Sequence, residues 1–249
     1  MQTPKTTLSD NLKDVYSRLL AAYGPQHWWP ADGRFEVMVG AILTQSTAWT
    51  NVAKAIRNLK AANSLSPEAL RRLSLDELAA LIRPSGYYAA KSLKLKALAG
   101  WVGEHNDDLV ETFAGDTEQL RCELLSVYGI GEETADSILL YGGCKPVFVV
   151  DAYTRRIVDR VGMAHGGTGY SDYQALFSFN LPSDVAMFNE YHALLVEHGK
   201  RVCRKDPLCP DCCILDVCEH GLWVTSARLS TGKGEGKPLP NKRDQHRLA

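Results

Sequence analysis

The stretch that decides the fold is LLSVYGIGEETADSILLYGGCKPVFVVDAYTRRIVDR, residues 124–160. At its centre, Gly129-Ile130-Gly131 separates a helical segment that ends near Val127 from another that starts near Glu132. Glycine adopts backbone conformations closed to other residues, and a glycine loop of this kind lets a phosphate approach the peptide N–H groups. The sequence therefore predicts a hairpin between two helices that binds DNA through Gly129 and Gly131.

An acidic residue follows this hairpin at the start of a further helix. The apolar run VFVV, residues 147–150, leads directly into Asp151, and a helical segment with two arginines comes next. Aspartate is a frequent N-cap, because its carboxylate accepts a hydrogen bond from an N–H group of the first turn. The positive end of the helix also favours the charged carboxylate. Asp151 is thus expected to cap a helix, and a capping carboxylate can also serve in catalysis.

Helical spacing recurs over the rest of the chain. Leu8, Leu12, Val15 and Leu19 share one face of a helix, and strand signals are scarce. Glycine, proline and serine breakers divide the chain into about ten helices of ordinary length. The last long helix is expected to run to Gly199. The fold class predicted from this pattern is all-α.

Composition limits the kinds of partner. The formal net charge is −1 over 249 residues, so any affinity for DNA must come from local patches. One such patch is a basic C-terminal arm from 227 to 249, expected to be flexible. The N-terminus lacks the pattern of a secretion signal, and no run is apolar enough for a membrane span, which predicts a cytoplasmic protein without a membrane partner.

Five of the seven cysteines lie within CRKDPLCPDCCILDVC, residues 203–218. In a protein of the cytoplasm such density indicates metal binding and not disulfides. The four candidate ligands have the spacing C-x5-C-x2-C-x5-C, and Cys213 could replace the third: they are Cys203, Cys209, Cys212 and Cys218. Tetrahedral zinc is an open alternative to an iron-sulfur cluster. The remaining two cysteines, Cys122 and Cys144, are expected to be buried thiols.

The order of hairpin, helix, apolar run, Val-Asp, helix and cysteine loop resembles the endonuclease III (HhH-GPD) superfamily of DNA glycosylases over about residues 30–220. The resemblance implies a two-lobed helical fold, a [4Fe-4S] cluster on the four cysteines named above, double-stranded DNA as the partner, and a monomer. It assigns 1–32 plus 145–220 to the lobe of the terminal helices and the cluster. It assigns 33–144 to the lobe that ends in the hairpin, and 221–249 to a flexible basic tail.

The same resemblance gives roles to individual residues. Asp151 would stabilise a sugar cation and orient or deprotonate the attacking water. Gln45 would occupy the gap left by an extruded nucleotide, while Arg204 and Lys205 would lie against the DNA backbone. Bifunctional members carry a lysine where this chain has Glu133, and a carboxylate cannot form a Schiff base. A glycosylase with weak or absent strand cleavage is therefore expected.

Two aromatic motifs resemble the 3-methyladenine branch of that superfamily. They are His27-Trp28-Trp29-Pro30 and the run GAILTQSTAW, residues 40–49. A flipped methylated purine is flat and cationic, and it stacks well between electron-rich rings, here Trp29 and Trp49. We therefore expect a base pocket formed by Trp29, Pro30, Trp49, Glu133 and Lys200.

Other interpretations remain open from the sequence. The tryptophans could simply fill a gap between helices. The lesion could be a neutral mismatched or deaminated base, with Glu133 protonating the departing base. The basic segment that begins at Tyr87 and Tyr88, with Lys91, Lys94 and Lys96, could contact DNA or be a solvated helix face. In a third interpretation, the protein is a noncatalytic iron-sulfur DNA-binding protein in which Asp151 is only a cap.

Overall fold

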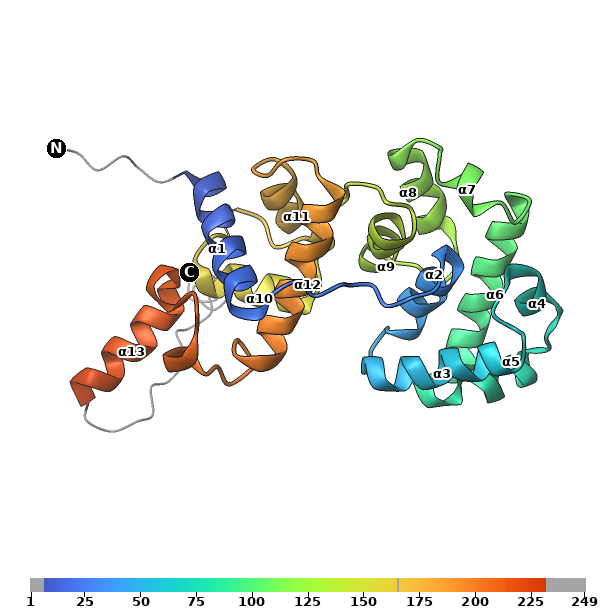
Figure 1. Ribbon diagram of the computed structural model, residues 1–249, viewed down its shortest axis with the longest axis horizontal. Helices are drawn as coiled ribbons and strands as arrows, with labels where there is room; N and C mark the ends of the chain where they lie inside the picture. The colour runs from blue at the N-terminus through green and yellow to red at the C-terminus, as the bar shows by residue number, and fades with distance from the viewer. Residues whose placement is uncertain (1–6, 165, 232–249) are drawn as a thin grey trace, which may run out of the picture. The chain divides into compact units, whose positions relative to one another are not determined.

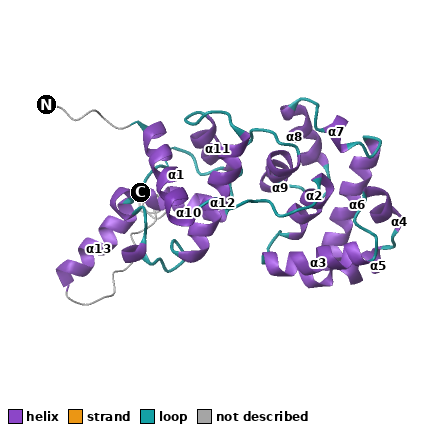
Figure 2. Cartoon of the chain, viewed as in Figure 1, coloured by secondary structure: helices purple, strands orange, loops and turns teal. Residues whose placement is uncertain are grey.

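The computed structural model describes residues 7–164 and 166–231 of the chain (Figure 1). Every regular element within those residues is a helix, as Figure 2 shows, which confirms the all-α prediction. The chain folds into two compact units. The terminal unit comprises the described parts of Met1–Gln26, Val150–Pro182 and Glu190–Ala249, and the central unit comprises His27–Val149 and Ser183–Asn189. Compared with the lobes drawn from the sequence, 27–32, 145–149 and 183–189 fall in the central unit and not in the terminal one.

The helices of the central unit begin where local capping favours them. A serine or aspartate side chain before α4, α5 and α8 accepts a hydrogen bond from a backbone N–H of the first turn. The elements of this unit are α2 (Arg34–Leu43), α3 (Trp49–Ala61), α4 (Pro67–Arg72), α5 (Leu75–Ile82), η1 (Arg83–Ser85), α6 (Tyr88–Glu104), α7 (Leu109–Thr112), α8 (Thr117–Ser126), α9 (Glu132–Ser137) and the π-helical turn η2 (Ile138–Gly142).

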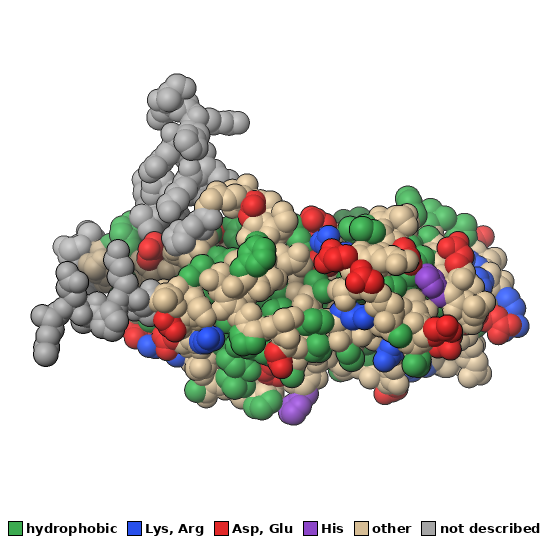
Figure 3. All heavy atoms as spheres, turned by 90° about the horizontal axis from the view of Figure 1, so that it is seen from above, with side chains coloured by type: hydrophobic (Ala, Val, Ile, Leu, Met, Phe, Trp, Pro, Cys, Tyr) green, Lys and Arg blue, Asp and Glu red, His purple; other side chains and the backbone are tan. Residues whose placement is uncertain are grey.

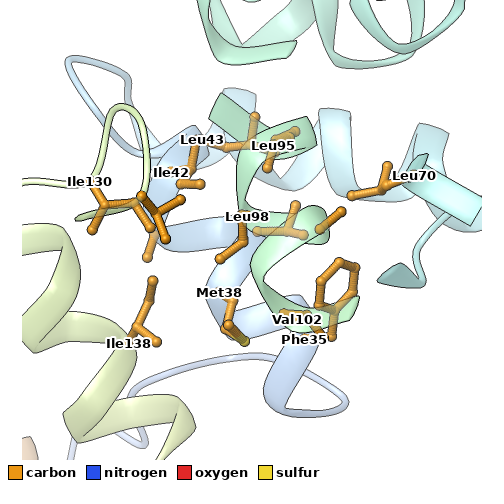
Figure 4. Packing of buried hydrophobic residues seen from close by; sticks show 14 of the residues in the cluster. Phe35, Met38, Ile42, Leu43, Leu70, Leu95, Leu98, Val102, Ile130 and Ile138 are labelled. Carbon is orange, nitrogen blue, oxygen red and sulfur yellow. The ribbon is translucent and has the colours of Figure 1, made fainter. Parts of the chain in front are cut away.

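The core of the central unit surrounds α2. Residues 35–43 of this helix are all buried, and all of them except Glu36 are apolar or glycine. Helix α6 packs against α2, α4 and α5, and α9 packs against α2 and α8. Figure 4 shows Met38 and Ile42 of α2 among Leu95, Leu98 and Ile138, all of them buried. The hairpin and the aromatic residues described below are attached to this core.

The terminal unit holds the two ends of the described chain. Its helices are α1 (Leu8–Tyr23), α10 (Ala152–Val161), α11 (Tyr170–Ser178), most of α12 (Val185–Arg201) and α13 (Glu219–Thr231), with the short turns η3 (Cys209–Asp211) and η4 (Leu215–Val217). Leu12, Val15 and Leu19 of α1 are buried, as their spacing predicts. The Tyr191 hydroxyl donates to the Leu12 carbonyl over 2.9 Å and joins α12 to α1. The predicted last long helix corresponds to α12, which continues two residues beyond Gly199 to Arg201.

The C-terminal segment differs from the sequence prediction. A flexible tail was expected from residue 221, whereas α13 occupies Glu219–Thr231. This helix packs against α10 and the turns η3 and η4, so tertiary contacts order a segment whose composition suggested a free arm. The rest of the predicted basic arm, 232–249, lies outside the described residues.

The surface carries no single dominant charge on the face drawn in Figure 3, where acidic and basic side chains are interspersed. That distribution agrees with the formal net charge of −1. Among the described helices, none is long and apolar enough to cross a membrane.

Candidate functional site

The hairpin lies between α8 and α9, with helix boundaries at Ser126 and Glu132 as the sequence predicts. Between the two glycines, Ile130 is 6% exposed and reaches into the core of the central unit, as Figure 4 shows. Its backbone N–H donates to the Val127 carbonyl over 3.1 Å. The hairpin is therefore anchored from within, and its glycines remain at the surface.

The two hairpin glycines are not equivalent. Gly129 has φ +83°, in the left-handed region that favours glycine, whereas Gly131 has φ −101°. A Cβ on Gly129 would lie 2.3 Å from Cγ of Lys94, while a Cβ on Gly131 would meet no atom within 4 Å. The prediction that both glycines supply special backbone freedom is wrong for Gly131, whose value to the hairpin is its open surface.

A buried ion pair joins the two helices of the hairpin. Nε of Arg121, on α8, donates to Oδ1 of Asp136, on α9, over 2.7 Å, and its Nη2 lies 3.2 Å from Oδ2. The side chain of Asp136 is fully buried. Replacing one partner of such a pair is strongly destabilising, because the other charge is then left buried without its counter-ion. Arg121 was not found from the sequence, since its partner is fifteen positions away on another helix.

Gln45 contacts the hairpin through its whole amide. Its Nε2 donates to the Gly129 carbonyl and to Oγ1 of Thr134, each over 3.0 Å. Its Oε1 accepts from Nζ of Lys94 over 2.5 Å. The predicted inserting side chain is therefore bonded to protein groups when no DNA is present.

The aromatic residues of the central unit form one packed cluster. The rings of Trp28, Trp29 and Trp49 lie with centroids 5.0 to 5.3 Å apart, and Tyr141 lies 5.2 Å from Trp29. Trp29 and Trp49 meet edge to face at 90°. Two rings in direct contact leave no slot for a base between them. The expected sandwich of a base between Trp29 and Trp49 is therefore absent, and a base could stack only on an outer face of the cluster.

Trp29 is fixed tightly in this cluster. A Cβ on Gly40 of α2 would lie 3.2 Å from Cζ2 and Nε1 of its indole, so only glycine gives the ring this position without a shift. Its Nε1 is buried and has no hydrogen-bond partner among the residues that the structure describes. Pro30, which follows Trp29, is exposed, and Trp49 is half-buried at the start of α3. The alternative in which the tryptophans fill a gap between helices thus describes part of what they do.

Glu133 is exposed in the first turn of α9, at the position where the superfamily pattern has its lysine. Its backbone carbonyl accepts from Oγ of Ser137 over 2.7 Å. The side chain is accessible to a substrate, and it is not an amine.

The basic start of α6 is not a uniform solvated face. Lys91 is 2% exposed, and its Nζ donates to the carbonyls of Leu43 and Ser85 and to Oγ1 of Thr47 over 2.7 to 2.8 Å. Burial lowers the pKa of Lys91 to about 8. Nζ of Lys96 donates to the carbonyls of Arg71 and Leu73. Two of the three lysines are thus internal supports, a distinction that sequence spacing did not reveal.

In the terminal unit, Asp151 is the N-cap of α10. Its Oδ1 accepts from the Thr154 N–H over 2.7 Å, as the sequence predicts. Its Oδ2 lies 3.8 Å from Nε2 of His192, on α12. Burial lowers the pKa of His192 and Lys200 lowers it further, while the charge of Asp151 raises it. Lys200 itself is exposed.

Four cysteines line one cavity of the terminal unit. These are Cys203, Cys209, Cys212 and Cys218, and the cavity is completed by side chains that include Ile157, Arg160, His198 and Ile214. Cys213 is not among its lining residues. Burial raises the pKa of Cys213, with Tyr23 acting on it in the opposite direction. Of the two adjacent cysteines, Cys212 lines the cavity and Cys213 does not, and the role of Cys212 as a ligand stays a prediction.

The four cysteines line the cavity without forming the compact set of ligands that one metal ion needs. Four thiolates around one zinc ion lie about 2.3 Å from it, which brings their sulfurs close together. Among the described residues, however, no group of three or more His, Cys, Asp or Glu side chains could hold one metal ion.

Groups around the cavity donate to its sulfurs. Nη1 of Arg160 lies 3.3 Å from Sγ of Cys203, and the Gly221 N–H donates to Sγ of Cys218 over 3.4 Å. His198 is fully buried, with Nδ1 2.8 Å from the Tyr23 hydroxyl and Nε2 3.6 Å from Sγ of Cys212. His198 is therefore the satisfied structural residue that its position suggests.

The loop after Cys203 is fixed from α10. Arg160 donates to the carbonyls of Arg204 and Lys205 over 2.6 and 2.9 Å, and Arg156 donates to the Cys203 carbonyl over 2.8 Å. The side chains of Arg204 and Lys205 are exposed. Sequence reasoning missed Arg160, although its spacing of four from Arg156 puts both on one helix face.

The prediction that Cys122 and Cys144 are buried is wrong, because both are exposed.

Comparisons with known proteins agree with this architecture. Residues 39–181 match the family model described as HhH-GPD superfamily base excision DNA repair protein. A candidate DNA repair glycosylase of Methanocaldococcus jannaschii is 46% identical over 206 residues, which cover 82% of this chain and 94% of that protein. Endonuclease III of Thermotoga maritima is 31% identical over 186 residues, covering 74% of this chain and 82% of the relative.

Two solved structures illustrate the structural similarity. The H. pylori 3-methyladenine DNA glycosylase bound to 1,N6-ethenoadenine aligns with a TM-score of 0.68 and 28% identity, over 78% of this chain and 97% of its own. An endonuclease III in a non-covalent DNA complex aligns with a TM-score of 0.73 and 19% identity, over 91% of this chain and 100% of its own. The second similarity concerns the fold alone.

Proposed function

This chain belongs to the HhH-GPD superfamily of base excision DNA repair proteins, and from that premise we propose that it is a monofunctional DNA glycosylase acting on alkylated purines in double-stranded DNA. The first candidate base is 3-methyladenine. The proposal is supported by the match over residues 39–181, by a relative at 46% identity whose name describes a DNA repair glycosylase, and by the hairpin and the capping carboxylate. In this proposal the protein acts as a monomer.

The observation that carries the proposal is the state of Asp151. Its Oδ1 is held by the Thr154 N–H over 2.7 Å, so the carboxylate is fixed at the positive end of α10. As the glycosidic bond breaks, the base leaves with the bonding electrons and the sugar becomes cationic. A fixed negative charge beside that cation lowers the barrier, and the carboxylate takes a proton from the attacking water. Base excision by hydrolysis needs no further covalent partner.

Monofunctional action is supported by Glu133. Strand cleavage by bifunctional members proceeds through a Schiff base on an amine, and the exposed side chain at this position is a carboxylate. Water is therefore the proposed nucleophile.

The substrate class is supported by the aromatic cluster and by one comparison. Trp28, Trp29 and Trp49 offer ring faces on which a flat cationic base gains more than a neutral one. The H. pylori neighbour at 28% identity is named for 3-methyladenine and is bound to 1,N6-ethenoadenine. Because Trp29 and Trp49 touch, the proposed contact is stacking on one outer ring face, beside the exposed Pro30. Glu133 and Lys200 remain proposed pocket residues.

For DNA binding, we assign the backbone of Gly129 and Gly131 and the side chains of Gln45, Arg204 and Lys205. The glycines present an open hairpin surface, and the two basic side chains are exposed. Contacts of these groups with DNA phosphates would explain how a protein of near-zero net charge binds DNA.

We also assign a [4Fe-4S] cluster to Cys203, Cys209, Cys212 and Cys218, which line one cavity. The chemistry that such a cluster supplies here is organisation of the loop, since its four thiolate bonds tie together residues 203–218. Arg160 would then place a positive donor beside Cys203.

A second candidate keeps the fold and changes the lesion to a neutral mismatched or deaminated base. It is favoured by the exposed Glu133, which could protonate a departing base that is not already cationic. The absence of a slot between Trp29 and Trp49 also weakens the argument for a sandwiched cation.

The test is single-turnover base release from duplexes that each carry one lesion, with Asp151→Asn as the variant. The natural protein should release methylated purines fastest. Asp151→Asn should keep its DNA affinity and lose roughly a thousandfold or more in rate, because the charge beside the cation is gone. Its free energy of unfolding should change little, since asparagine caps helices as well as aspartate does.

Two outcomes would redirect the proposal. Faster release of uracil, thymine or mismatched adenine would favour the second candidate. A near-normal rate for Asp151→Asn would leave that residue as a cap only, and no base release by the natural protein would favour a noncatalytic DNA-binding protein.

A further inference from the structure

The three lysines at the start of α6 have different partners. Lys91 and Lys96 donate to backbone carbonyls, which cannot move away from them without deforming the fold. Lys94 instead donates to the side-chain oxygen of Gln45 over 2.5 Å. A side-chain amide can rotate away, so Lys94 is the lysine of these three whose partner can change at little cost.

Lys94 also lies directly on the hairpin. Its Cγ, Cδ and Cε would stand 2.3, 2.5 and 2.7 Å from a Cβ at position 129, so its stem occupies the space that Gly129 leaves empty. The side chain is half-buried, and within the described part of the chain its ammonium bonds to the Gln45 amide and not to a carboxylate. A phosphate approaching the hairpin would therefore meet a positive charge that the protein has paired with a neutral amide.

Gln45 cannot act on DNA while this contact persists. Both N–H groups of its amide are used by the Gly129 carbonyl and Thr134, and its oxygen accepts from Lys94. To enter the gap left by an extruded nucleotide, the amide must give up these three bonds. A charged phosphate oxygen is a better acceptor for an ammonium than a neutral amide oxygen is.

We propose that Lys94 is a phosphate-binding residue that is paired with Gln45 in the DNA-free protein. When the hairpin meets DNA, the ammonium moves to a backbone phosphate, and Gln45 is released to contact the nucleic acid. Phosphate binding at the hairpin and insertion of Gln45 are thereby coupled through one exchange of partners. This inference rests on the proposed function in so far as that function assigns DNA to the hairpin.

The first experiment measures affinity for a duplex containing an abasic analogue, and for the undamaged duplex, between about 50 and 200 mM salt. Lys94→Met keeps the stem over Gly129 and removes the charge. Its slope of log K against log salt should be smaller than that of the natural protein by about 0.9, the value for one phosphate contact. Lys94→Arg should retain the slope.

The matched control is Lys13→Met, which removes an exposed lysine from α1 and so makes the same change in net charge. Its slope should equal that of the natural protein. An unchanged slope in Lys94→Met would overturn the proposal, because Lys94 would then stay with the protein in the complex.

The second experiment tests the competition between Gln45 and phosphate. The undamaged duplex has no gap for Gln45 to enter, so Gln45→Ala loses no DNA contact there. The ammonium has no amide to leave in this variant, so that duplex should bind about 3- to 10-fold more tightly, which is the worth of one hydrogen bond. The same substitution in the Lys94→Met background should give no such gain. Weaker or equal binding by Gln45→Ala would overturn the exchange.

These measurements separate this inference from the function on which it rests. Binding to the undamaged duplex does not require base release, so a protein that releases no base still reports the slope and the effect of Gln45→Ala. A protein that releases base normally but shows neither effect would retain the proposed function and lose the exchange.

Discussion

Replacing Gly129 by alanine, with Gly131→Ala as its matched control, separates two glycines that look alike in the sequence. Gly129 has φ +83°, and alanine in that region costs about 1 to 2 kcal/mol. The new Cβ would also stand 2.3 Å from Cγ of Lys94, so the lysine stem must move. Movement of the stem takes the ammonium from Oε1 of Gln45, and one such hydrogen bond contributes about 0.5 to 1.5 kcal/mol.

An opposing effect reduces the loss. Alanine restricts the unfolded chain more than glycine does, which stabilises the fold by about 0.4 to 1 kcal/mol. Gly129→Ala should therefore lose about 1 to 3 kcal/mol in free energy of unfolding. Gly131 has φ −101° and open space where a Cβ would stand, so Gly131→Ala should stay within about 0.5 kcal/mol of the natural protein.

Urea unfolding followed by circular dichroism measures both variants under one set of conditions. The second measurement is affinity for duplex DNA, because a methyl group on Gly131 would stand where a phosphate is proposed to approach. Gly131→Ala should keep its stability and lose affinity. Equal losses of stability in both variants would refute the reasoning, since the difference rests on the φ value and on Lys94 alone.

Four further predictions follow from other parts of the structure. Anaerobically purified protein should contain about four irons per chain, and stoichiometric zinc without iron would contradict the cluster. Cys203→Ser should make the protein poorly soluble and Cys213→Ser should have a mild effect, because only Cys203 lines the cavity. Borohydride should not trap the natural protein on abasic DNA, and Glu133→Lys should introduce trapping, whereas efficient trapping of the natural protein would show that another amine acts. Trp49→Ala should slow release of a methylated purine more than it weakens binding to an abasic product, because an abasic product has no base and stacking contributes about 1 to 3 kcal/mol per base. Equal effects on base release and on binding to the abasic product would exclude stacking on this ring. Burial lowers the pKa of His192, so below about pH 6.5 the unfolded chain binds a proton that the folded chain does not, and the free energy of unfolding should decrease as the pH is lowered through this range. His192→Gln should reduce this dependence on pH, and an unchanged dependence would assign it to other groups.

The local features of this protein were predictable from the sequence because they depend on residues close together in the chain. The boundaries of α8 and α9 follow from helical spacing and two glycines, and the cap at Asp151 requires only the N–H of Thr154, three positions away. The cysteine loop is only 16 residues long, so the spacing of its cysteines already predicts that they lie close together. For the same reason the all-α class was correct.

The sequence predictions were wrong where they inferred exposure from composition and the packing of helices decided it. The tail from 221 was expected to be free, yet α13 packs against α10 and the cysteine turns. Lys91 lies on a basic helix but is buried, because carbonyls of Leu43 and Ser85 surround its ammonium. Neither outcome depends on the residues next to it in sequence.

The sequence by itself determined the family, the hairpin, the capping carboxylate and the set of candidate ligands, since each is a short pattern with its own local physics. The tertiary structure decided what those residues touch. Gly129 is distinguished from Gly131 by a lysine 35 positions earlier, Gln45 is bonded to groups 84 and 89 positions away, and Trp29 meets Trp49 edge to face. Such contacts depend on how helices pack against the shared core, and that packing is set by side-chain volumes throughout the unit and not by any one motif.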